Sequence, residues 1–201
     1  MPELLRLEHF GFTYPQQPCP ALADVSLTVR QGEFWVLCGA SGCGKTTLLR
    51  QLKPALRPHG AAEGRILFDG QPLDDLPPHR QAADIGFVLQ SPEEQTVTDK
   101  VWHELAFGLE SLGCDTPSIR RRVAEMASFF GIQDWFHRKV DELSGGQKQL
   151  LALASVMVLQ PRLLILDEPT SQLDPIAAAD FLQTVGPVSY THLTLPTNSL
   201  V

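Results

Sequence analysis

The stretch Gly39–Thr47, which reads GASGCGKTT, limits what this chain can fold into more than any other feature. It fits the pattern G-x-x-x-x-G-K-[ST], in which glycines let backbone N–H groups turn inward around a polyphosphate. The apolar run 34–38 before it has strand composition, and residues 47–52 after it have helix composition with no breaker until Pro54. Strand, glycine loop and helix are the order that a phosphate site needs. A glycine-rich turn that binds nothing is the alternative, which these flanks disfavour.

The phosphate loop supplies specific chemistry at its end. Lys45 would reach the β- and γ-phosphates of a nucleotide, and the hydroxyl of Thr46 would bind Mg²⁺. The residues predicted to contact the nucleotide are Gly39, Ala40, Ser41, Gly42, Cys43, Gly44, Lys45, Thr46 and Thr47.

Composition excludes several other classes of protein. With 201 residues the chain has the size of one large domain, or of a compact core with an insert. Its formal net charge of −7 argues against a general nucleic-acid binder, which shows a basic excess. The cysteines at 19, 38, 43 and 114 form no C-x-x-C pair, which favours reduced thiols in a cytosolic protein and no metal site.

No segment has the pattern of a leader or of a membrane span. Residues 2–6 carry no apolar region behind a basic start, and the longest apolar stretch, 150–159, is too short to cross a bilayer. We therefore expect any membrane role to come through a partner.

Alternating apolar runs and helical repeats indicate an α/β fold. Strand patterns cover residues 4–7, 22–29, 65–70, 85–90 and 163–168. Between residues 97 and 140 apolar side chains repeat at helical spacing, which predicts a helical insert over about 91–142. Pro117, behind Asp115 and Thr116, marks the start of the second helix of this insert.

Two acids stand at the end of the apolar run 163–166. Delivered by a strand, Asp167 would bind Mg²⁺ through water, and Glu168 would orient and polarise an attacking water as a general base. A solvated strand end is the alternative, and the phosphate loop upstream favours the catalytic interpretation.

Two further segments contain residue types that commonly contact a nucleotide. Ser144, Gly145 and Gly146 precede a predicted helix that runs to about Leu159, and small residues at a helix start form an anion-binding geometry. Tyr14 lies in an aromatic bend, where its ring either stacks on a nucleotide base or anchors a hairpin. From the residues alone both roles of Tyr14 stay open.

Five separate patterns in one order resemble those of an ABC-type ATPase. Its Walker A, Q-loop, LSGGQ signature, Walker B and D-loop are matched by Gly39–Thr46, Gln90, Leu143–Gln147, Leu166–Glu168 and Ser171–Asp174. The resemblance covers residues 3–186 and implies ATP and Mg²⁺ as cofactors. It also implies a P-loop NTPase core, a mostly parallel sheet flanked by helices, with an N-terminal antiparallel β subdomain and an inserted α-helical subdomain.

The same resemblance implies roles for single residues. Tyr14 becomes the ring that stacks on adenine, and Gln90 becomes the sensor of Mg²⁺ and water. Asp174 signals across a dimer. The γ-phosphate of ATP held by the opposite subunit is bound by Ser144, Gly145, Gly146 and Gln147, which implies a head-to-tail homodimer or heterodimer.

A narrower resemblance concerns the type of transporter. Residues 90–97 (QSPEEQTV) and 104–110 (ELAFGLE) are similar to those of energy-coupling factor importers for vitamins, cobalt or nickel. In that family an integral membrane coupling subunit docks on the helical insert, which places the ATPase at the cytoplasmic face of the membrane. A plain amphipathic helix over 106–109 is the alternative.

The end of the chain departs from the family pattern. The family has a switch histidine on a further apolar strand, and His192 does not fit, because Gly186–Ser189 leaves no buried strand to deliver it. Residues 188–197 (VSYTHLTLPT) instead resemble the translated read-through of a sequencing adapter. We therefore expect an incomplete nucleotide-binding domain over 1–187 and a non-native tail over 188–201, with weak nucleotide binding and slow or absent hydrolysis.

Three functions are consistent with the sequence. The first is the ATP-hydrolysing subunit of a membrane importer. The second is a soluble ABC ATPase that acts on ribosomes or DNA, although the chain shows no tandem cassette or long coiled-coil insertion and its charge is acidic. The third is a nucleotide-binding fragment without activity.

Overall fold

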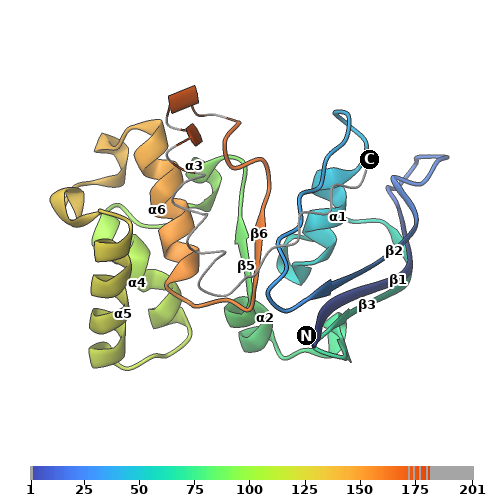
Figure 1. Cartoon of the computed structure of the whole chain (residues 1–201), viewed down its shortest axis with the longest axis horizontal. Coiled ribbons are helices and arrows are strands. Elements are labelled where there is room, and N and C mark those ends of the chain that lie inside the picture. Colours follow the sequence, from blue (N-terminus) through green and yellow to red (C-terminus); the bar gives the residue numbers. More distant parts are fainter. Residues whose placement is uncertain (1, 172, 174, 177, 180, 182–201) are drawn as a thin grey trace. The chain divides into compact units, whose positions relative to one another are not determined.

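The computed structural model describes residues 2–171, 173, 175, 176, 178, 179 and 181 (Figure 1). This part of the chain divides into two compact units, the first built from residues 2–81 and the second beginning at Ala82. The tail predicted over 188–201 lies outside the described residues.

The first unit is organised around an antiparallel sheet. Its strands are β1 (Glu3–Thr13), β2 (Leu22–Arg30), β3 (Ala61–Phe68) and β4 (Gln71–Pro72), in the spatial order β2-β1-β3-β4. β1 forms the centre and pairs with β2 and β3 on its two sides. Alternate side chains of β1 are buried, which matches a sheet with one covered face. The strands predicted over 4–7 and 22–29 are confirmed, and the strand predicted over 65–70 begins earlier, at Ala61, and gives way to a turn at residues 69 and 70.

The three longest strands share an irregularity at one level. His9 in β1, Asp24 in β2 and Gly64 in β3 all adopt left-handed backbone conformations, with φ of 48°, 52° and 77°. The register shifts on both sides of His9, and its Nδ1 lies 2.7 Å from the Asp24 carboxylate. These bulges increase the twist of the sheet locally.

Short helices complete the first unit. They are α1 (Lys45–Gln51), the 3-10 turns η1 (Pro54–Leu56) and η2 (Leu73–Asp75), and α2 (Pro78–Asp84), which leads into the second unit. Arg57 secures the end of α1: its Nε donates to the Gln51 carbonyl at 2.9 Å, and its guanidinium pairs with Asp74.

The strand expected over residues 34–38 is wrong. The chain is extended there without strand pairing, and Phe34, Trp35, Val36 and Leu37 expose 39, 42, 58 and 44% of their surface. Trp35 Nε1 donates to the Glu33 carboxylate at 2.9 Å, which also accepts from the Arg30 amide. An apolar run becomes a strand only where a neighbour supplies hydrogen bonds and cover. The composition of the run does not supply that neighbour.

The second unit combines a parallel strand pair with helices. β5 (Ile85–Val88) pairs in parallel with β6 (Leu163–Leu166), and the chain between them forms α3 (Pro92–Gln95), α4 (Val101–Ser111), α5 (Thr116–Phe129), η3 (Gln133–Trp135), η4 (Val140–Glu142) and α6 (Gly145–Met157). α6 packs on β5 so closely that a Cβ on Gly86 would lie 2.5 Å from Val156 Cγ1. The sheets of the described chain therefore comprise two parallel and four antiparallel strands, fewer parallel ones than the resemblance implies.

Local helix signals in the insert are confirmed. The Asp115 carboxylate accepts a hydrogen bond from the Ser118 amide at 2.9 Å, which lowers the pKa of Asp115, and Pro117 stands in the first turn of α5. α6 begins where Ser144 and the following glycines predicted a helix start. Within the described part of the chain, no helix has the length and apolar character to cross a membrane.

The central irregularity of the antiparallel sheet leads to a test of stability. Gly64 and Gly70 both have a φ of 77°, but a Cβ on Gly64 would collide with the His9 and Glu8 carbonyl oxygens, whereas Gly70 has open space. We expect Gly64→Ala to lower the free energy of unfolding by about 2 kcal/mol more than Gly70→Ala, since only the first adds a clash to the shared backbone strain. Urea unfolding of both variants measures the difference, and equal losses would contradict the described close approach.

Candidate functional site

The phosphate loop owes its path to two glycines. Gly42 and Gly44 have φ values of 80° and 97°, in the left-handed region that glycine adopts without strain. Gly44 is also the residue that caps the start of α1. A Cβ on Gly44 would lie 2.7 Å from the Ala21 carbonyl oxygen and 3.0 Å from Leu22 Cδ2. Both the conformation and the space at this position therefore require glycine.

Lys45 lies across this loop. Its ammonium donates to the carbonyl oxygens of Gly39 and Ala40, each at 3.0 Å, and lies 3.9 Å from the Cys43 sulfur. Residues 39–43 are exposed, so the charge stands beside an accessible backbone. A compact positive charge beside a glycine-rich turn suits a polyphosphate group, and the binding of phosphate by Lys45 stays a prediction.

Tyr14 reaches the start of α1. Its hydroxyl lies 2.9 Å from the hydroxyl of Thr47, which is 9% exposed. The Tyr14 and Phe12 rings are T-shaped, with centroids 5.0 Å apart. The contact with Thr47 could not be predicted from local patterns, because the two residues are distant along the chain. The stacking of Tyr14 on adenine stays a prediction.

The second unit holds the acidic strand end. Asp167 is 2% exposed, and its amide donates to the Val88 carbonyl at 3.1 Å, which extends the pairing of β6 with β5. Glu168 is exposed and has a φ of 46°, a left-handed conformation that costs a residue with a side chain about 1–2 kcal/mol. The parallel strands end at the same edge, so the residues that follow them come together.

Gln90 holds Glu168 at this edge. The Gln90 side-chain amide donates to the Glu168 carboxylate at 3.2 Å and to the Ser171 hydroxyl at 3.3 Å, and the Ser171 amide donates to the Glu168 carbonyl at 3.1 Å. Two residues predicted from separate motifs are thus in direct contact. Ser171, the first residue of the predicted D-loop, completes the cluster.

The signature segment forms a reciprocal cap. Ser144 Oγ accepts from the Gln147 amide at 3.3 Å, and the Gln147 side-chain oxygen accepts from the Ser144 amide at 3.0 Å. Gly145 has open space around its Cα, so the first turn of α6 presents bare backbone. The helix start is where the sequence predicted it, and the anion contact stays a prediction.

A hollow of about 350 Å³ lies on the surface of the second unit, and we call it the acidic hollow. It is lined by Glu93, Thr96, Val97, Thr98, Asp99, Val140, Asp141 and Lys148. Lys148 Nζ lies 3.1 Å from Glu93 Oε1, and this hydrogen bond lowers the pKa of Glu93. Val97 is 64% exposed at the hollow. Three carboxylates face one ammonium there, so the surface is acidic.

A buried acid that sequence reasoning missed shapes one wall of the hollow. Glu104 is 6% exposed and accepts hydrogen bonds from the amides of Val97 and Thr98 and from the Thr98 hydroxyl, at 3.1, 2.8 and 2.9 Å. Its position between Val101 and Leu105, on the apolar face of α4, was the available signal. A carboxylate on such a face needs partners, and here it takes them from the loop.

The predicted residues form two groups, one in each unit. The phosphate loop and Tyr14 belong to the first unit, and Gln90, Ser144–Gln147, Asp167 and Glu168 belong to the second. Asp174 and His192 lie outside the described residues. The described residues contain no cluster of three or more His, Cys, Asp or Glu suited to a metal. Mg²⁺ bound largely by phosphate and water needs no such cluster.

Comparison with known proteins places these motifs in one family. Residues 22–171 match the family "ABC transporter", which covers most of the chain. An ABC transporter ATP-binding protein of Bacillus cereus, as it is named, is 51% identical over 88% of this chain and 32% of its own length. The cobalt import ATP-binding protein CbiO of Syntrophus aciditrophicus is 38% identical over 91% of this chain and 65% of its own.

The fold matches as well. The structure of cbiO1 from Clostridium perfringens, titled as part of the ABC transporter complex cbiONQ, superposes with a TM-score of 0.83 at 29% identity. The superposition covers 95% of this chain and 75% of the cbiO1 chain. The fold and the glycine loop define an ATP-binding P-loop protein of mixed α/β type. This chain belongs to the ABC transporter family. It spans about a third of the length of the Bacillus relative.

The reciprocal cap of α6 can be tested apart from any ligand. Ser144→Ala removes the acceptor for the Gln147 amide, and we expect it to lower the free energy of unfolding by about 1 kcal/mol. Ser144→Asp keeps an acceptor at this position and should retain most of the stability. Urea unfolding compares the two, and equal destabilisation by both would show that the cap does not stabilise α6.

Proposed function

We propose that this chain is the ATP-binding and ATP-hydrolysing subunit that powers a membrane ABC importer of the energy-coupling factor type. The observation that carries the hydrolytic part is the contact of Gln90 with Glu168 at the shared end of β5 and β6. A carboxylate at this point has the chemistry of a general base, and the amide beside it orients that carboxylate. Residues 1–187 form the nucleotide-binding domain, with the helical insert at about 91–142.

Different residues of the chain have different roles in the hydrolysis of ATP. Gly39–Thr47 hold the polyphosphate through backbone amides, and the Lys45 ammonium neutralises charge on the β- and γ-phosphates. Glu168 accepts the proton of the attacking water. Thr46, Asp167 and Gln90 are the residues that would hold Mg²⁺, which would supply positive charge to offset that of the phosphates. Their oxygen atoms are the donors that Mg²⁺ prefers, and Asp167 is held almost fully buried at the end of its strand.

A second ATP-binding subunit completes the site. The capped start of α6 offers Ser144, Gly145, Gly146 and Gln147 to a phosphate of ATP held by the opposite subunit, and Asp174 carries the signal across the interface. The support from the structure is the bare first turn of α6, where open space surrounds Gly145. The second subunit is either another copy of this chain, in a homodimer, or a different chain, in a heterodimer.

The membrane partner docks on the helical insert. The acidic hollow supports this proposal, because Glu93, Asp99 and Asp141 suit a helix that carries Arg or Lys, and exposed Val97 suits an apolar side chain beside it. The likeness to the cobalt import protein CbiO and to the cbiONQ component supports the importer type. Held in this way, the subunit lies at the cytoplasmic face of the membrane.

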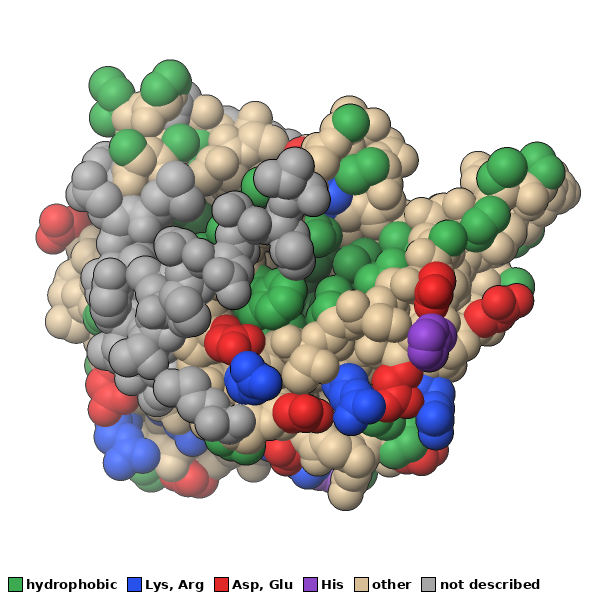
Figure 2. Space-filling model, turned by 45° about the vertical axis from the view of Figure 1, so that its right-hand side comes forward, with side chains coloured by type: hydrophobic (Ala, Val, Ile, Leu, Met, Phe, Trp, Pro, Cys, Tyr) green, Lys and Arg blue, Asp and Glu red, His purple; other side chains and the backbone are tan. Residues whose placement is uncertain are grey.

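The charges of the chain disfavour nucleic acid as a partner. On the face that Figure 2 shows, Lys and Arg side chains lie among Asp and Glu side chains and form no patch of one sign. The formal net charge of −7 adds repulsion from a phosphate backbone.

The catalytic assignment is tested by steady-state hydrolysis of ATP with Mg²⁺. In a version whose residues 188–201 are replaced by a natural continuation, Glu168→Gln keeps the size of the side chain but removes the base, and we expect a fall in turnover of about 10²- to 10⁴-fold with ATP binding retained. Lys45→Ala should lose binding itself. Glu125→Gln, an exposed substitution on α5, is the matched control and should leave turnover unchanged.

Unchanged turnover of Glu168→Gln would overturn the base assignment. The same assay on the chain as it stands tests the predicted tail, because slow or absent hydrolysis is expected there. Full activity of the chain as it stands would show that the tail prediction is wrong, and co-sedimentation with ribosomes would favour the non-transport function.

The docking surface is tested by association with the membrane coupling subunit. Asp99→Asn combined with Asp141→Asn removes two charges from the acidic hollow, and we expect about tenfold slower association at low salt, with the difference shrinking as salt screens the charges. Asp134→Asn combined with Glu125→Gln changes the net charge equally outside the hollow and serves as the control. Equal effects of the two pairs would show only a general charge effect.

A further inference from the structure

We propose that Tyr14 is a positioning residue for the polyphosphate site: its hydroxyl, through Thr47, fixes the start of α1 and with it the phosphate loop. This inference rests on the proposed function and extends it, because it gives the hydroxyl of Tyr14 a role toward the phosphates that is separate from any contact of its ring with a base.

The first observation is the hydrogen bond itself. Tyr14 Oη and Thr47 Oγ1 lie 2.9 Å apart, and Thr47 is almost fully buried in the first turn of α1. Lys45, whose ammonium lies across the loop, begins the same turn. A change in the position of Thr47 therefore moves the backbone that carries Lys45.

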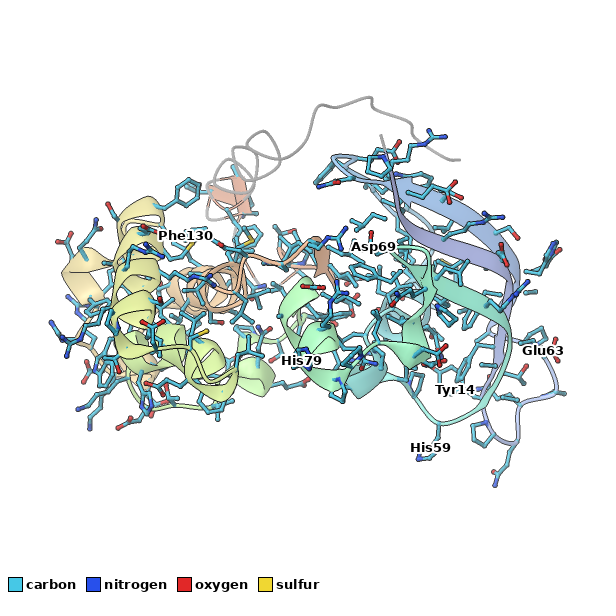
Figure 3. All side chains as sticks on the ribbon, turned by 90° about the horizontal axis from the view of Figure 1, so that it is seen from below. Tyr14, His59, Glu63, Asp69, His79 and Phe130 are labelled. Carbon is cyan, nitrogen blue, oxygen red and sulfur yellow. The ribbon has the colours of Figure 1, made fainter. Side chains whose placement is uncertain are left out.

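The second observation is that Tyr14 is itself held in place. Its ring is T-shaped against Phe12, which is 2% exposed, and its carbonyl accepts from the Gln17 amide at 3.2 Å. Figure 3 shows Tyr14 at the same end of the antiparallel sheet as His59 and Glu63. A Cβ on Gly60 would lie 2.5 Å from the Phe12 ring, so the neighbouring chain closes tightly on this aromatic pair.

The third observation is that the same hairpin contacts the loop at a second point. The start of β2 presses on Gly44 through the Ala21 carbonyl and the Leu22 side chain, and the Ala21 amide donates to the Phe12 carbonyl at 2.8 Å. The end of β1 and the start of β2 thus meet one junction, where the loop becomes α1. Contact at two points fixes the direction of a segment, whereas contact at one point only limits its distance.

The physical need for this bracing lies in the length of α1. A helix of seven residues is unstable alone in water, so tertiary contacts decide where it begins. Threonine in a helix has two accessible rotamers, one of which turns its hydroxyl back to the preceding carbonyls. A hydrogen bond to Tyr14 selects between these rotamers and keeps the first turn in one conformation.

The test separates the hydroxyl of Tyr14 from its ring by using a ligand without a base. Tyr14→Phe keeps the ring, and Thr47→Val keeps the shape of the side chain. Each substitution removes the hydrogen bond between the two hydroxyls. The probes are Mg²⁺–tripolyphosphate and Mg²⁺–ATP, with dissociation constants measured calorimetrically on the full chain. We expect each variant to bind both probes about three- to tenfold more weakly. The double variant should be no weaker than either single one, because both changes remove one interaction.

Glu125→Gln, an exposed substitution on α5 outside the site, should bind both probes as the unaltered chain does and serves as the control. Wild-type affinity of Tyr14→Phe for tripolyphosphate, tighter binding, or a loss confined to ATP would each overturn the inference. Lys45→Ala distinguishes a failure of this inference from a failure of the proposed function. Binding that depends on Lys45 but not on the Tyr14 hydroxyl refutes the inference alone, whereas no binding of either probe by the unaltered chain refutes both.

Discussion

The left-handed turn at Gly44, pressed against the Ala21 carbonyl, is the constraint on which the nucleotide-binding half depends. It sets the angle at which the chain leaves the loop and enters α1, and it does so at a point where no side chain fits. The antiparallel sheet supplies the surface against which this turn is pressed. The β1–β2 hairpin is therefore part of the phosphate site, although none of its backbone belongs to the loop.

In the second unit, strand pairing and side-chain hydrogen bonds position the predicted site residues. Parallel pairing of β5 and β6 brings the residues that follow the two strands to one edge, and Gln90 joins Glu168 and Ser171 there. Glu168 stands in a strained backbone conformation, which persists only where the surroundings over-determine it. Strain at this carboxylate and a hydrogen bond that aims it are the features expected of a group kept for chemistry rather than for stability.

Local patterns predicted much of this structure. The caps at Asp115 and Ser144, the glycine loop and the strands that end before Gln90 and Asp167 all depend on residues close together in the chain, where steric and hydrogen-bond rules act directly. The failures are non-local. The run 34–38 has strand composition but no strand pairing, and composition does not reveal which neighbour a strand will find. The contact of Tyr14 with Thr47 and the burial of Glu104 likewise depend on tertiary placement, which no nearby residue encodes.

The position of the helical segment between β5 and β6 also has a kinetic consequence. The β1–β2 hairpin closes a short loop, and its pairing is available early, whereas β5 cannot pair with β6 until the whole helical segment has been made and brought back on itself. Until then the fully buried face of β5 stands open. We therefore expect the edge that carries Glu168 to be among the last parts to form, at a rate that depends on how fast α4, α5 and α6 fold.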